Sequence, residues 1–203
     1  VPTVHANYRY FEMYDDNLQK IDCWFGGGSD LTPYYLFEED AEHFHKSQKK
    51  VADSYGEDLY PKFKKQCDDY FRNHHRNEAR GVGGTFYDYL KEDGKRSAED
   101  WMKFNMDMGK AFIPSYIPIA EKRKNLPWTE ENRYWQEIRR GRYVEFNLVH
   151  DRGTLFGLKT NGRIESILMS LPPRVRWDYN HQAEEKTEEA KLLKVLVEPK
   201  EWI

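Results

Sequence analysis

The sequence predicts an α+β fold in which an antiparallel sheet is covered by helices. Strand-like runs come as hairpin pairs and helix-like runs come as neighbours, without the regular strand–helix alternation of a wound parallel sheet. The 203 residues include 11 Phe, 14 Tyr and 6 Trp, which argues against disorder and indicates an aromatic core. We therefore expect residues 1–203 to form a single domain.

A long strand is expected over Thr3–Tyr14, where ring and polar side chains alternate. Asp15–Asn17 is a turn cluster, and Ile21–Phe25 is predicted to be the antiparallel return strand. The glycines at Gly26–Gly28 are expected to end that strand as a flexible turn. Because glycine lacks a Cβ, these residues and the following Asp30 also allow a ligand to approach the backbone closely.

Two helices and a strand are expected next. Glu38–Tyr55 carries acidic residues first and lysines later, which suits the helix dipole, and Gly56 follows it. Tyr60–Arg76 has aromatic residues and a cysteine at helical spacing. A second glycine cluster, Gly81–Gly84, then precedes a short β-prone run at Thr85–Leu90.

Ser97 and Asp100 resemble a capping box at the start of a long helix. Proline removes a backbone donor, so this helix is expected to be interrupted or kinked at Pro114 or Pro118. A further helix is expected over Thr129–Arg140, capped by its first residue.

The C-terminal third is predicted to contain a three-stranded meander followed by an amphipathic helix at Ala183–Val197. Residues typical of hairpin turns separate the three β-prone runs of this meander. The runs are Arg142–Val149, Thr154–Lys159 and Arg163–Met169.

Charge and composition exclude several classes of protein. The formal net charge of -3 gives no reason to expect nucleic acid or an anionic membrane as partner. No apolar run approaches the length of a membrane span. With only Cys23 and Cys67, a reducing compartment is expected, and we predict a cytoplasmic location, with the mitochondrial intermembrane space as the alternative. Because the chain begins at Val1 without Met, we expect it to lack an N-terminal part.

Three polar residues at the start of the chain form the first candidate site. His5, Asn7 and Arg9 recur with period two, so they share one face of the predicted strand. They either converge on a ligand or form a half-exposed polar sheet face. Guanidinium groups bind carboxylates through paired hydrogen bonds, so the arginines near predicted turns are candidates for holding a polycarboxylate, with a structural ion pair as the alternative. These arginines are Arg9, Arg80, Arg152 and Arg163.

The remaining histidines do not predict a metal site. His43 and His45 are two residues apart on a probable helix and therefore point to different faces, and His74 and His75 are adjacent. No helical His-x-x-x-His or Glu-x-x-His arrangement accompanies them. We expect no bound metal.

Several long motifs, in order, resemble the oxygen-dependent coproporphyrinogen oxidase family. The resemblance extends from the first residue to Trp202, and its length makes chance similarity improbable in a way that a single glycine pattern would not. The motifs are Val1–Glu12, Trp24–Pro33, Leu59–Lys65, Arg80–Gly84, Arg139–Leu148, Asp151–Leu158 and Arg163–Pro172.

The resemblance implies a large, flat, mainly antiparallel sheet sandwiched between helices, and a homodimer. It implies a reaction that uses molecular oxygen as co-substrate with no metal or organic cofactor, converting two propionates of coproporphyrinogen III to vinyl groups. By resemblance, His5 is a proton donor and Asp30 contacts the pyrrole nitrogens. The residues implied to bind the substrate are Asn7, Tyr8, Arg9, Gly162 and Arg163, and Arg9 is also placed among the catalytic residues with His5 and Asp30.

Two other classes of function remain as alternatives. A non-catalytic tetrapyrrole-binding module would keep the fold without turnover, although the presence of His5, Arg9 and Asp30 favours the enzyme. A metal-dependent hydrolase is disfavoured because the sequence lacks the spacing of metal ligands.

Overall fold

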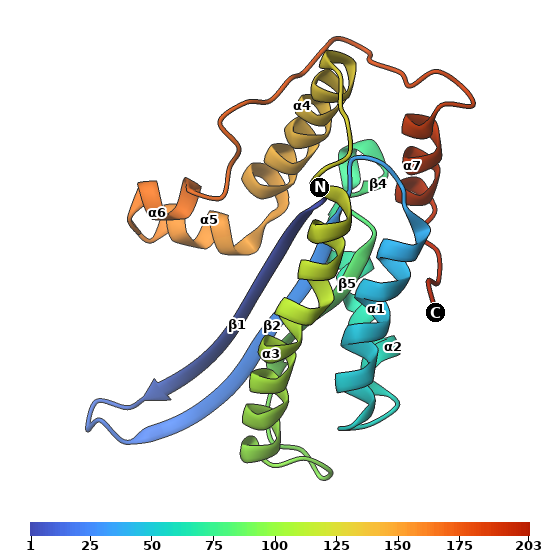
Figure 1. Cartoon of the computed structure of the whole chain (residues 1–203). Helices are drawn as coiled ribbons and strands as arrows, with labels where there is room; N and C mark the ends of the chain where they lie inside the picture. Colours follow the sequence, from blue (N-terminus) through green and yellow to red (C-terminus); the bar gives the residue numbers. More distant parts are fainter.

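The computed structural model describes all 203 residues, Val1–Ile203, as a three-stranded antiparallel sheet surrounded by helices (Figure 1). The α+β prediction is confirmed, but the sheet is smaller than the large one that the resemblance implied. In chain order the elements are β1 (Thr3–Tyr14), β2 (Lys20–Thr32), α1 (Glu38–Asp53), α2 (Leu59–Tyr70), β3 (Arg72–Asn73), the 3₁₀ turn η1 (His74–Arg76), β4 (Glu78–Ala79), β5 (Gly83–Leu90), α3 (Ala98–Arg123), α4 (Glu130–Glu145), the π-helical turn η2 (Phe146–His150), α5 (Arg152–Lys159), α6 (Ile164–Leu168) and α7 (Glu188–Val197).

The sheet has the order β1-β2-β5, and its central strand is longer than predicted. We expected the return strand to end at the glycines, but β2 continues through them to Thr32 and pairs with both neighbours. The glycines are needed because the backbones lie very close together. A Cβ on Gly28 would lie 2.3 Å from the carbonyl oxygen of Thr85, and one on Gly84 would lie 2.0 Å from that of Ser29.

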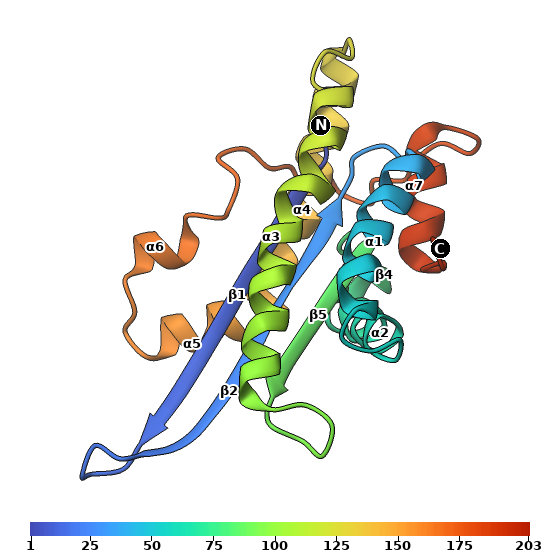
Figure 2. The ribbon, with the colours of Figure 1, turned by 60° about the horizontal axis from the view of Figure 1, so that its bottom comes forward.

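One face of the sheet is covered by α1, α2 and α3, and Figure 2 shows α3 lying along it. The side chains between these layers are mostly aromatic, as the composition predicted, and burying them stabilises the fold. The largest cluster comprises Phe25, Ala52, Leu59, Tyr60, Phe63, Tyr87, Leu90, Trp101, Phe104 and Met108.

Helix α3 begins with the predicted capping box: the Ser97 hydroxyl accepts from the Asp100 backbone N–H, and the Asp100 carboxylate accepts from the Ser97 backbone N–H. The predicted interruption is wrong, because the helix continues through Pro114 and Pro118 to Arg123. Tertiary contacts hold its last turns in place. Arg123, for example, donates to both oxygens of Asp40 on α1, at 2.8 and 2.9 Å. Such contacts compensate for the hydrogen bonds that proline removes.

The predicted meander is also wrong, because most of residues 142–168 are helical and none of them is in a strand. Helix α4 continues to Glu145 and is followed directly by η2, α5 and α6. The turn-forming residues serve helix ends here: the Asp151 carboxylate accepts from the Thr154 backbone N–H at 2.8 Å, and Asn161 adopts a left-handed φ of 54° between α5 and α6. Strand propensity depends on context, and at the start of this segment the packing of Phe146 against Phe71 and Phe86 overrides it.

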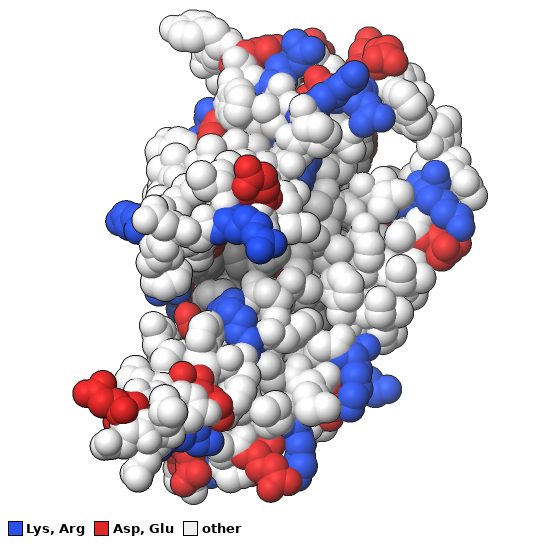
Figure 3. All heavy atoms as spheres, turned by 90° about the vertical axis from the view of Figure 1, so that its left-hand side faces the viewer, with Lys and Arg blue, Asp and Glu red and all other residues white.

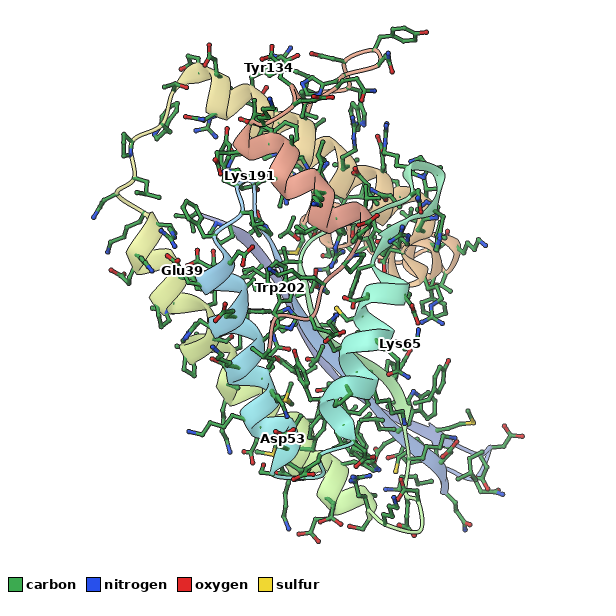
Figure 4. All side chains as sticks on the ribbon, turned by 90° about the vertical axis from the view of Figure 1, so that its right-hand side faces the viewer. Glu39, Asp53, Lys65, Tyr134, Lys191 and Trp202 are labelled. Carbon is green, nitrogen blue, oxygen red and sulfur yellow. The ribbon has the colours of Figure 1, made fainter.

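The C-terminal segment returns to the body of the protein after α7. That helix confirms the prediction of a final helix, although it begins later than expected, at Glu188. Helix α2 likewise ends earlier than expected, at Tyr70. Figure 4 shows Trp202 between α1 and α2, where its indole N–H donates to the carbonyl oxygen of Val82 at 3.1 Å. None of the helices combines the length and apolarity that crossing a membrane requires.

Candidate active site

The second face of the sheet carries a row of polar side chains on β1. His5, Asn7 and Arg9 alternate with residues that face the helices, and all three are only partly buried. The predicted sharing of one face is confirmed. Figure 3 views the side of the molecule that carries the β1–β2 hairpin, α5 and α6, and shows a hollow with lysine and arginine side chains at its edge.

The pairing of β1 with β2 brings Asp30 to one end of this row. His5 lies opposite Asp30 in the register, and His5 Nδ1 is 3.0 Å from Asp30 Oδ1. Antiparallel partners project to the same side of a sheet, so the hairpin register alone is enough to create this contact.

Arg80 joins the same end from the segment between β4 and β5. Its Nη2 lies 2.8 and 2.7 Å from the two carboxylate oxygens of Asp30, and the side chains of both residues are 2% exposed. Its guanidinium also lies 4.0 Å from the ring centre of Phe71 and 4.8 Å from that of Phe146. Aromatic faces attract a guanidinium, so the arginine is held by an acid on one side and by rings on the other.

This environment keeps Asp30 ionised. Burial alone would raise the pKa of Asp30, but the charge of Arg80 and the hydrogen bond from His5 outweigh burial and hold the pKa below its ordinary value. A buried carboxylate with a fixed charge is therefore available at the base of the site.

Hydrogen bonds along the row determine the tautomer of His5. Arginine can only donate, so Arg9 donates to the side-chain oxygen of Asn7, and the Asn7 amide nitrogen then faces His5 Nε2 at 3.3 Å. His5 Nε2 must accept, and Nδ1 must donate to Asp30. Asp30 therefore orients the imidazole and would stabilise positive charge on it.

The other end of the row is more open. Arg9 Nη2 lies 3.5 Å from Asp88 Oδ1, and the two side chains are 30% and 26% exposed. Both groups lie over Gly26 of the central strand, where a Cβ would approach them to 2.7 and 2.8 Å. This end presents a cation that solvent and a ligand can reach.

The remaining predicted residues lie elsewhere. Tyr8 projects to the helix-covered face, where its hydroxyl donates to the Met108 carbonyl at 3.0 Å and burial raises its pKa to about 12. Gly162 and Arg163 lie between α5 and α6, and the Arg163 side chain is exposed and forms no ion pair. The structure therefore brings His5, Asn7, Arg9 and Asp30 together, but not these three residues.

Two partners of the row were not predicted as site residues. The sequence marks Arg80 only as one of several arginines near turns, and Asp88 carries no motif, although period two in its strand places it with Phe86 on the polar face. Asp151 accepts from the hydroxyl of Tyr70 at 2.9 Å, and that ring stacks on Phe86. Nothing in the local sequence signals this contact of Asp151, because its partner Tyr70 lies 81 residues away on α2.

A cavity of about 530 Å³ lies away from this row, between the β2–α1 and α3–α4 connections. It contains none of the row's residues. Of its lining residues, Arg123 is already bound to Asp40 and Glu39. Acid, imidazole and guanidinium groups also meet at Glu145, which pairs with His75 and Arg76. Only the row on β1 contains the His5, Arg9 and Asp30 that the sequence predicted as site residues, so we place the candidate active site there.

Known proteins resemble this chain over its whole length. The family model described as coproporphyrinogen III oxidase matches residues 1–202. A protein of Arabidopsis thaliana named coproporphyrinogen-III oxidase 1, chloroplastic, is 54% identical over 205 residues, which cover 100% of this chain and 52% of the relative. Oxygen-dependent coproporphyrinogen-III oxidases of Drosophila melanogaster and Homo sapiens, the latter named mitochondrial, are each 53% identical and covered to 51% and 44% of their lengths.

These relatives correct one expectation and identify the family. The predicted cytoplasmic location is wrong, because the plant and human relatives are named chloroplastic and mitochondrial. The chain spans about half the length of the relatives it matches. Because the family model and all of these relatives cover essentially the whole chain, the chain belongs to the coproporphyrinogen III oxidase family.

Proposed function

We propose that this chain takes part in the oxygen-dependent oxidative decarboxylation of coproporphyrinogen III to protoporphyrinogen IX, a step of haem and porphyrin biosynthesis. The observation that supports this most directly is the linked row of Arg80, Asp30, His5, Asn7 and Arg9, which runs from a buried end to an accessible end. It places a fixed negative charge at the base of the site and an accessible cation beside it, which suits a substrate that has central N–H groups and peripheral carboxylates.

Each group has a role in the proposed reaction. Arg9 binds a propionate carboxylate, and Asp30 accepts hydrogen bonds from pyrrole N–H groups and stabilises positive charge on the ring. Each decarboxylation converts a propionate to a vinyl group with loss of carbon dioxide, one proton and two electrons. Molecular oxygen accepts the two electrons and, with this proton and a second one from solvent, leaves as hydrogen peroxide. His5 moves the proton that the propionate releases.

The proposal includes oxygen as co-substrate, no metal or organic cofactor, and a homodimer. Substrate contact by Tyr8, Gly162 and Arg163 also remains a prediction. Arg163 is exposed and unpaired between α5 and α6, so binding a carboxylate would not require breaking an existing ion pair.

The test is aerobic incubation of coproporphyrinogen III with this chain and with the full-length protein, following protoporphyrinogen and carbon dioxide with and without a chelator. We expect turnover that the chelator does not affect and that Asp30→Asn strongly reduces. Asp16→Asn, on the exposed hairpin turn, is the matched control. Binding of substrate without carbon dioxide release by the full-length protein would support a non-catalytic binding module instead.

A further inference from the structure

The pair formed by Arg9 and Asp88 reaches across the central strand of the sheet. Arg9 comes from β1 and Asp88 from β5, and both charged groups lie over Gly26 of β2. Because Gly26 has no side chain, the two groups meet above bare backbone. They therefore occupy the space that a flat ligand lying on this face would enter.

A bulge in β5 aims Asp88 at this position. The register of β2 and β5 shifts between Phe25 and Gly27, and Tyr89 has a left-handed φ of 54°. The backbone N–H of Tyr89 donates to Asp88 Oδ1 at 3.1 Å. Bulges redirect side chains and are common beside active sites, and a left-handed φ is unusual for an aromatic residue.

The contact itself is loose. Its single approach of 3.5 Å is longer than a good charged hydrogen bond, and both side chains are accessible to water. Ion pairs of this kind change an equilibrium constant by roughly fivefold at most. An incoming carboxylate that engages the guanidinium through two parallel hydrogen bonds would therefore replace Asp88 at little cost.

We propose that Asp88 is a placeholder carboxylate, which holds Arg9 over Gly26 in the free protein and yields it to a propionate of the substrate. Asp88 then sets substrate affinity by competing for Arg9. This inference rests on the proposed function, since it takes the substrate carboxylate as the group that displaces Asp88.

The test measures the affinity of the chain for coproporphyrin III, the stable oxidised form of the substrate, by fluorescence titration. We expect Asp88→Asn to bind roughly two- to fivefold more tightly than the wild-type chain. The gain should vanish in the Arg9→Ala background, because no guanidinium is then released. Asp22→Asn is the matched control: Asp22 also pairs with a cation, Lys91, and has similar exposure, but lies away from the row, so its affinity should be unchanged.

Three results would overturn the proposal. Equal or weaker binding by Asp88→Asn would mean that Asp88 supports Arg9 instead of competing for it, and the proposed function would stand as long as the wild-type chain binds. An equal gain in affinity for Asp22→Asn would mean that the effect comes from the change in net charge and not from the release of Arg9. If the wild-type chain binds no coproporphyrin, the proposed function fails and this inference fails with it. Circular dichroism and thermal unfolding of each variant establish that the fold is retained.

Discussion

Two arginine–aspartate pairs stand at opposite ends of the same polar row. Arg80 and Asp30 approach to 2.7 Å, and each side chain is 2% exposed, whereas Arg9 and Asp88 approach only to 3.5 Å and are about a third exposed or less. Residue types are identical in the two pairs, and only burial and geometry differ.

The buried pair is fixed in place, whereas the exposed pair can exchange partners. The buried pair has lost its water, so its attraction is strong and separating it is costly. The outer pair keeps its water and is screened, so its partners can change at little cost. A site that must hold an acid in place and also capture a carboxylate from solution needs one pair of each kind.

The largest expected effect comes from breaking the buried pair. Asp30→Ala leaves the Arg80 guanidinium charged and buried without its acid, so the free energy of unfolding should fall by about 3–5 kcal/mol. Urea denaturation followed by circular dichroism at pH 7 measures it. A loss below about 1 kcal/mol would mean that water reaches Arg80 and that the two ends of the row are alike.

Adding a side chain to the central strand β2, which lies between the two ion pairs, should lower the stability of the protein. Gly28→Ala places a Cβ 2.3 Å from the Thr85 carbonyl oxygen, at a φ of +154°, so we expect a loss of about 2–4 kcal/mol in unfolding free energy. Gly94→Ala is the control, because no atom lies within 4 Å of its Cβ. Equal stability of the two variants would mean that β2 and β5 separate without cost.

Removing the accessible cation should affect binding more than folding. Arg9→Ala removes a charged hydrogen bond to the substrate, so kcat/KM of the full-length protein should fall by about tenfold to a hundredfold, mainly through KM. Thermal unfolding should change little, because the ion pair that is lost is exposed. A large loss of stability with unchanged KM would mean that Arg9 supports the fold and does not bind the substrate.

The pH dependence of the free energy of unfolding should report the ionisation of Asp30 in the buried pair. The pKa of Asp30 is lower in the folded chain than its ordinary value of 3.8, so its contribution is present above that value and is lost as the pH falls through the folded-state pKa. The stability difference between wild type and Asp30→Asn should therefore shrink on acidification, by at most about 1.4 kcal/mol per pH unit. Urea denaturation between pH 6 and pH 3 measures it, and a constant difference would contradict the prediction.

The smallest effect is expected from breaking the outer pair. Asp88→Ala should change the free energy of unfolding by less than about 1 kcal/mol, since the pair is single and solvated. The same denaturation experiment measures it. A loss comparable to that of Asp30→Ala would remove the distinction between a fixed pair and an exchangeable pair.

Local patterns in the sequence predicted part of this site correctly. Alternation along an extended strand is a property of the chain itself, so period two was enough to place His5, Asn7 and Arg9 on one face. The same local reasoning failed over the three β-prone runs after Arg142, which are largely helical. Phe146 in the first run packs in an aromatic cluster, and Asp151 caps the helix that contains the second run. Local reasoning also predicted that β2 ends at its glycines. These glycines instead allow the backbones of β2 and β5 to lie close together.

Patterns within the chain are enough to predict the α+β class, the aromatic core and the hairpin that carries the row, and its long motifs identify the family. The acid that each arginine meets depends on how distant segments pack together. Arg80 is 50 residues from Asp30 and Asp88 is 79 residues from Arg9, so strand register, a bulge and burial determine these pairings. Burial then sets the strength of each pair, and no local pattern encodes burial because it depends on which distant segments cover a residue.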